Sequence, residues 1–261
     1  MRPEIATATG QRRDRLGKSA GHGWLGVPAA LTALAVNGRF FAARQPGTPL
    51  RVLSLMAIDA ALRARGITMT PDRRQAVIEA MELGARLNDR FDGDAHDPEA
   101  LRASVAWFVH STHREVVWNY TKRLRRLERT RPDPGGCGNA VRRYRESVNS
   151  VSLAALWALA RARSLAVAEV EIAREADLRL LFQIVMQMQL IDDVLDVSDD
   201  RRRGLPSFAT GPDVTAASLR ELVAGYSDAR RIRLDWNFCL RVALKLVAAS
   251  ARVLIAIRKS A

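Results

Sequence analysis

Apolar positions recur along this chain with the period of an α-helix. They return every three or four residues through almost the whole sequence, and no stretch shows the sustained alternation of a half-buried β-strand. Breakers divide the pattern, and the helices predicted between them cover residues 28–44, 49–65, 70–92, 97–129, 139–163, 166–200, 214–230 and 234–259. The sequence therefore predicts an all-α fold.

Two of these helices begin with a complete start signal. Residues 70–72, Thr-Pro-Asp, supply an N-cap, a first-turn proline and a first-turn acid, and Gly93 supplies the stop. Residues 97–99, Asp-Pro-Glu, repeat the start signal. We expect the helix that they open to continue without a break to about Arg129.

One domain is expected, preceded by a tail. Residues 1–27 are polar, basic and contain glycine, which is typical of a mobile tail and not of a signal peptide. Residues 28–261 are expected to form a single helical domain. The clearest loop, at 131–139, has apolar helices on both sides and so does not indicate a domain boundary.

The net charge of +13 indicates an anionic partner. Nucleic acid, an anionic membrane surface and a phosphorylated small substrate all satisfy it. Only two cysteines occur, too few for a disulfide framework, so a cytoplasmic location is expected.

The most apolar run of the C-terminal region, residues 236–257, carries three cations. Arg241, Lys245 and Arg252 interrupt it, whereas a spanning helix needs about 20 nearly uncharged residues. We therefore expect a soluble protein. Contact of this basic, amphipathic helix with a membrane surface remains open.

The sequence QLIDDVLDVSDDRRR, residues 189–203, places carboxylates directly behind an apolar helix. Positions i, i+4 and i+8 share a helix face, so Asp192, Asp196 and Asp200 are expected to line one side, with Asp193 beside them. Toward the N-terminus the same face continues through an amide and an aromatic ring, those of Gln189 and Phe182. The face is thus predicted to be apolar below and acidic at its mouth.

A second acidic cluster, NDRFDGD, ends the helix that begins after Thr70. Asp89 and Asp92 are three residues apart and hence neighbours on the helix. Like charges repel at this spacing, and negative charge opposes the dipole at a helix C-terminus. Groups of oxygen ligands suit Mg²⁺, which would offset the repulsion in both clusters.

Together the two clusters resemble the motifs of class I (trans) isoprenoid synthases. The stretch QLIDDVLDVSDDRRRGLPSF resembles their second aspartate-rich motif, and LNDRFDGD lies where their first, DDxxD-type, motif would be. Asp89 and Asp192 are 103 residues apart, which leaves room for the helices that bring the motifs face to face. With the helical order around them, the resemblance covers roughly residues 28–258.

The resemblance implies an isoprenoid-synthase-type helical bundle around a central apolar cavity. Two acidic rims would hold three magnesium ions and the diphosphate of an allylic substrate of C10 to C20, and a homodimer is a family expectation. The implied metal ligands are Asp89, Asp92, Asp192, Asp196 and Asp200, and Asp193 joins the catalytic set. The implied substrate-binding residues are Arg145, Asn149, Gln189, Arg201, Arg202 and Phe182, with Arg145 near the place of a diphosphate-sensing arginine.

The sequence departs from chain-elongating members in ways that favour a single diphosphate site. No arginine pair follows the first motif, whose first position is Asn88, and Leu205 stands where a lysine is expected. A terpene synthase acting on one prenyl diphosphate is therefore slightly preferred. The alternative is a prenyltransferase that uses an acceptor other than isopentenyl diphosphate.

Two hypotheses from other classes stay open. The run KRLRRLERTR, residues 122–131, and the net charge suggest a helical nucleic-acid-binding protein, but no recognised binding motif supports it, so nucleic acid is not expected as a partner. The degenerate first motif suggests a helical partner that has lost catalysis.

Overall fold

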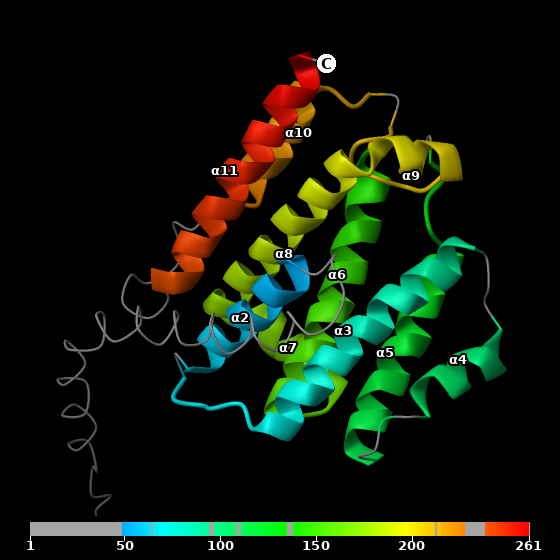
Figure 1. Cartoon of the computed structure of the whole chain (residues 1–261), viewed down its shortest axis with the longest axis vertical. Helices are drawn as coiled ribbons and strands as arrows, with labels where there is room; N and C mark the ends of the chain where they lie inside the picture. Colours follow the sequence, from blue (N-terminus) through cyan, green and yellow to red (C-terminus); the bar gives the residue numbers. More distant parts are fainter. Residues whose placement is uncertain are drawn as a thin grey trace, which may run out of the picture.

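The computed structural model describes residues 49–63, 65–93, 97–106, 108, 111–134, 138–211, 213–227 and 238–260. These residues form ten helices and no strand, so the all-α prediction is confirmed for this part of the chain (Figure 1). The expected tail at 1–27 and the expected helix at 28–44 lie outside the described residues.

The helices follow one another in the order drawn in Figure 1. Their bounds are α2 (Pro49–Arg63), α3 (Pro71–Asp92), α4 (Pro98–Val105), α5 (Ser111–Arg129), α6 (Gly138–Arg161), α7 (Leu165–Arg174), α8 (Ala176–Leu195), α9 (Val197–Arg203), α10 (Ala216–Gly225) and α11 (Phe238–Ser260).

Helices α6 and α8 form the middle of the bundle. Helix α6 packs against α3, α5, α7 and α8, while α8 also packs against α2 and α11. Helix α10 lies beside α11 at one edge of the molecule, and α4 lies at the opposite edge, against α5 (Figure 1). Helix α9 follows the acidic end of α8, and its Arg203 contacts Asp92 at the acidic end of α3.

The start and stop signals of α3 and the start signal of α4 are confirmed. Thr70 caps α3 by accepting a hydrogen bond from the Arg73 amide at 3.4 Å, and Gly93 is the C-cap. Asp97 caps α4 by accepting from the amides of Glu99 and Ala100, at 3.2 and 3.1 Å. These signals depend on neighbouring residues alone, which is why the sequence is sufficient to predict them.

The prediction of one continuous helix over 97–129 is wrong. Helix α4 ends at Val105, and α5 begins at Ser111. Between them Phe108 is 1% exposed, and its carbonyl accepts two hydrogen bonds from the Arg114 guanidinium, at 3.1 and 2.9 Å. Burial of this ring, with a side chain replacing the lost helical hydrogen bond, overrides local helix propensity.

The prediction of one continuous helix over 166–200 is also wrong. Glu175 is extended, with φ −91° and ψ 128°, and forms an ion pair with Arg65 from the segment after α2. Asp196 then separates α8 from α9 at φ −94° and ψ 10°, although the amides of Asp196 and Asp200 still donate to carbonyls four residues back. The acidic segment is therefore bent and not straight, and α9 continues to Arg203.

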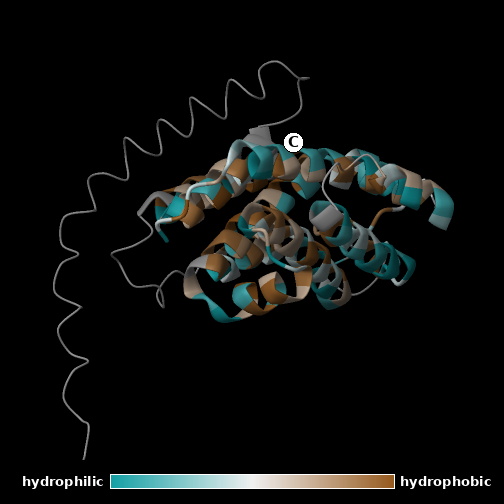
Figure 2. Ribbon diagram, turned by 90° about the horizontal axis from the view of Figure 1, so that it is seen from below, coloured by the Kyte–Doolittle hydropathy of each residue, from teal (hydrophilic) through white to brown (hydrophobic). Residues whose placement is uncertain are grey.

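The core consists mainly of residues from the inward faces of α2, α3, α6 and α8, and a smaller cluster joins α8 to α10 and α11. Apolar residues concentrate where the helices pack, and hydrophilic residues lie mostly outside (Figure 2). Trp157 is fully buried, and its indole N–H donates to Glu171 at 2.6 Å. No single helix of the described chain is long and apolar enough to cross a membrane; only the pair α6 and α7, bent by 111°, meets that measure together.

Candidate functional site

Asp193 is the centre of a buried polar network. Its side chain is 2% exposed and accepts from Arg145 Nη2 on α6 at 2.9 Å. It also accepts from Gln189 Nε2 at 2.6 Å and from the Phe208 amide at 2.7 Å. One carboxylate thus ties together α6, α8 and the segment that follows α9.

One more predicted site residue, Asn149, extends this network. Asn149, which is buried, donates from Nδ2 to the Arg145 carbonyl at 3.0 Å and to Gln189 Oε1 at 3.5 Å. Arg145 is 14% exposed, and its Nε is buried without a hydrogen-bond partner among the described residues. The structure therefore brings Arg145, Asn149, Gln189 and Asp193 together.

The other aspartates of the second cluster differ sharply in environment. Asp192 and Asp196 are exposed residues, whereas Asp200 is buried. Enclosure of the Asp192 carboxyl group by surrounding protein, and then the charges of Asp193 and Asp196, raise its pKa to about 6. Burial also raises the pKa of Asp200, opposed by a hydrogen bond with Ser207.

Asp92 of the first cluster lies against arginines of two other segments. It is 12% exposed, 3.4 Å from Arg203 Nη2 at the end of α9 and 3.9 Å from Arg131 Nη1 after α5. Burial raises the pKa of Asp92, opposed by those two arginines. Asp89, in contrast, is exposed.

The two acidic clusters consequently meet at one end of the bundle. Arg203 joins Asp92 to α9 across 111 positions of sequence. The positive charge of Arg145 acts both on Asp92 and on Asp192. Arg203 also lies 3.5 Å from Asp199, so it connects Asp92 of the first cluster to the second. The expected arrangement of the two motifs face to face across a central cavity stays a prediction.

Sequence reasoning missed a buried pair beside this site. Tyr144 donates to Glu128 Oε2 at 2.8 Å, and Glu128 is only 5% exposed. Burial raises the pKa of Glu128 and also that of Tyr144. Arg131 was missed as well, because it begins a loop that contains no chemical motif. The one signal for Tyr144 is its position directly before Arg145.

Arg201 and Arg202 lie on the outer side of α9. Both are exposed, and Arg202 forms an ion pair with Asp199. The structure thus places them outside the Asp193 network. The loop then turns at Gly204, whose φ of 65° is a left-handed conformation that glycine adopts without strain.

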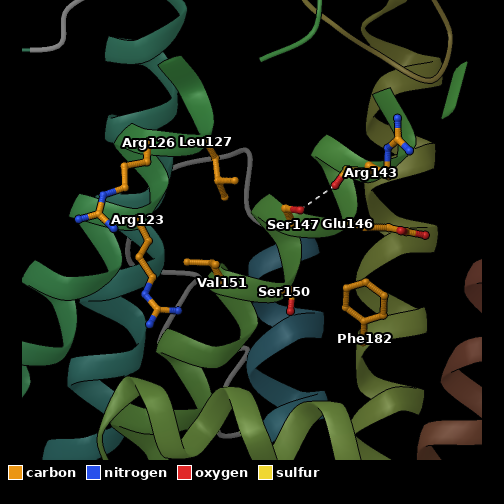
Figure 3. A pocket seen from close by; sticks show the side chains of 9 residues that line it. All are labelled: Arg123, Arg126, Leu127, Arg143, Glu146, Ser147, Ser150, Val151 and Phe182. Carbon is orange, nitrogen blue, oxygen red and sulfur yellow. Dashed lines mark hydrogen bonds between the residues drawn. The ribbon is translucent and has the colours of Figure 1, made fainter. Parts of the chain in front are cut away.

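Phe182 lies where α8 borders an open groove between α5 and α6. Figure 3 shows arginines of α5 on one wall and Phe182 on the other. The groove has a volume of about 840 Å³ and is lined by Arg123, Arg126, Leu127, Arg143, Glu146, Ser147, Ser150, Val151 and Phe182. The described residues show this open, partly cationic groove and no enclosed apolar cavity at the centre of the bundle.

The described residues include no group of three or more acidic, histidine or cysteine side chains already arranged to hold a metal ion. Asp89, Asp192 and Asp196 are nevertheless exposed residues, and their carboxylates are hard oxygen donors. Magnesium commonly takes only one or two carboxylates together with waters and substrate phosphates. The donor chemistry of these three residues therefore fits magnesium.

No protein-family model, curated protein or solved structure matches this chain. The fold and the site together define a helical bundle with a carboxylate and arginine cluster at one end.

Proposed function

We propose that this chain is a magnesium-dependent class I isoprenoid synthase, which ionises an allylic prenyl diphosphate and releases pyrophosphate. The observation that carries the proposal is the meeting of the two acidic motifs at one end of the bundle, with Arg145 and Arg203 between them. Carboxylates and arginines gathered in this way suit a ligand that combines metal ions with phosphate oxygens.

The proposed metal ligands are the exposed carboxylates Asp89, Asp192 and Asp196. Bound magnesium would supply positive charge that stabilises the departing pyrophosphate. Asp92 and Asp200 are more enclosed, and Asp92 already faces two arginines. We place these two beside the metal site, where they position Arg131, Arg203 and the Ser207 loop.

Asp193 acts in this proposal as a positioning residue. Its three hydrogen-bond donors hold its carboxylate inside the protein, away from any ligand at the surface. It fixes the Arg145 guanidinium, whose positive charge acts on both Asp92 and Asp192 and would attract a diphosphate bound beside them. When the allylic C–O bond breaks, its electron pair leaves with the pyrophosphate, and Arg145 would stabilise that charge.

The test is release of pyrophosphate from geranyl, farnesyl and geranylgeranyl diphosphate with Mg²⁺. Asp192→Asn should abolish release, because it removes a proposed ligand while leaving the Asp193 network intact. The control is Asp72→Asn, the same kind of change in the first turn of α3, at the end of that helix opposite its acidic cluster. This variant should release pyrophosphate at the wild-type rate. Absence of release from every substrate with both Mg²⁺ and Mn²⁺ would refute the proposal.

A second candidate is transfer of the prenyl group to an acceptor. The observation that favours it is the open groove beside Phe182, in which Arg123, Arg126 and Arg143 could bind an acidic or polar acceptor. An enclosed apolar cavity would suit cyclisation better, since it excludes water from the carbocation. Product analysis with and without added acceptors distinguishes the two reactions.

A further inference from the structure

Helix α11 is apolar on two opposite faces. Its inner face is buried in the bundle through Leu240, Leu244, Val247, Ala248, Ala251 and Ile255. Its outer face exposes Val242, Leu246, Val253 and Ile257, by 37, 63, 57 and 60%. The helix lies at an edge of the molecule, which leaves this outer face without a neighbour among the described residues (Figure 1).

The exposed side chains form one continuous stripe, defined here by Val242, Leu246, Ala249, Val253 and Ile257. Successive members are separated by three or four residues, so each step returns to the same side of the helix. The stripe runs about 22 Å along the helix, at 1.5 Å per residue. Single exposed apolar residues are ordinary, but an ordered stripe of this length indicates a binding surface.

Positive charge borders the stripe. The sequence of α11 contains five cations, Arg241, Lys245, Arg252, Arg258 and Lys259, and no acidic residue. Lys245 and Arg252 are exposed and lie along one edge of the stripe at helical spacing. The neighbouring α10 contributes one exposed arginine and one exposed glutamate, which cancel.

The apolar stripe and the cations along its edge favour one kind of binding partner for this face of α11. A second copy docked through the same face would oppose cations to cations, with no acid on either helix to compensate. A bilayer surface that contains anionic lipid offers apolar contact to the stripe and negative headgroups to its edge. We infer that the outer face of α11 docks on an anionic membrane surface, with the helix in the plane of the interface and its inner face still in the core.

The inference is independent of the proposed catalysis, and its test needs no substrate. The full chain should sediment with phosphatidylcholine vesicles that contain phosphatidylserine, and much less with phosphatidylcholine alone. Leu246→Asp/Val253→Asp should weaken binding by about tenfold or more, because apolar contact is lost and like charge is added. Neutralising Lys245 and Arg252 with glutamine should weaken it about fivefold per residue.

The matched control is Val167→Asp/Val170→Asp on α7, where both side chains are about as exposed, at 45 and 49%. It should bind vesicles as the wild type does. Failure of the wild type to sediment at low salt, or equal loss in both double variants, would overturn the inference.

Two further outcomes would also overturn it. A dimer in light scattering that Leu246→Asp dissociates, without vesicle binding by the wild type, would make a second copy the occupant. A clear fall in melting temperature for Leu246→Asp would show that the stripe is covered within the chain itself. An unchanged melting temperature together with lost vesicle binding supports the membrane surface.

Discussion

Replacing Arg145 with methionine tests the network that organises the candidate site. The Arg145 guanidinium pairs with Asp193 at 2.9 Å, and the two side chains are 14 and 2% exposed. Methionine occupies similar space but leaves the Asp193 charge buried without its cation. Breaking a buried pair from one side costs about 3–5 kcal/mol.

The lower end of that range applies here. Asp193 keeps two donors in the variant, the Gln189 amide group and the Phe208 backbone N–H, so its charge is not left wholly unsatisfied. We therefore expect a loss of about 3 kcal/mol in the free energy of unfolding. In a chain of this size that corresponds to a fall of roughly 6 to 12 °C in melting temperature.

Urea denaturation followed by circular dichroism measures the loss in the free energy of unfolding. Two further variants serve as controls for it. Arg142→Met makes the same change on the same helix, where the arginine is 45% exposed and pairs with Glu146; its cost should stay below about 1 kcal/mol. Arg145→Met/Asp193→Asn should regain part of the loss, since no uncompensated charge remains. If Arg145→Met costs no more than Arg142→Met, the buried pair does not organise the site as described.

Four further substitutions give separate checks. Gly204→Ala should destabilise the protein by about 1 kcal/mol, because it forces an alanine into a left-handed conformation at φ 65°. Gly225→Ala in α10 should stabilise the protein by a similar amount, because the space at its Cβ position is open. Thermal melts of both variants measure the two effects. Phe91→Ala should cost about 3–5 kcal/mol, as Phe91 is fully buried, and a loss under about 1 kcal/mol in urea denaturation would contradict its place in the core. Glu128→Gln should be more stable than the wild type at neutral pH and lose that advantage on acidification. Burial raises the folded-state pKa of Glu128, so the contribution of this carboxyl group to stability is complete below about pH 4 and disappears as pH rises through the folded-state pKa. If the group were solvated, urea melts across pH would show a difference between the two proteins that does not change with pH.

Local signals made parts of the fold predictable. The Thr70 cap and the Gly93 stop define α3 because both act within one helical turn. The breaks after Val105 and at Glu175 could not be predicted in that way. They depend on Arg114 reaching the Phe108 carbonyl and on Arg65, in the segment after α2, pairing with Glu175.

In the candidate site, too, local patterns are predictable from the sequence and contacts between distant segments are not. The sequence predicts Asp192 and Asp193 side by side at the acidic mouth of a helix, yet Asp192 is exposed and Asp193 is only 2% exposed. The difference arises because the partners of Asp193 include Arg145 and the Phe208 amide, on segments that only folding brings to α8. The pairing of Asp92 with Arg131 and Arg203 could not be predicted either, because neither arginine is near Asp92 in the sequence.

The hydrogen bond from the Phe208 amide to Asp193 determines when the buried network can form during synthesis of the chain. The residues of the network come from α6, α8 and the segment after α9. Asp92 likewise pairs with Arg203, which is synthesised 111 residues later. A growing chain on the ribosome therefore carries both acidic motifs before it has two of the groups that hold them, the Arg203 guanidinium and the Phe208 amide. Not until synthesis has passed Phe208 can the network close, so nascent chains stopped shortly before that residue should remain open to proteases at the C-terminal ends of α3 and α8.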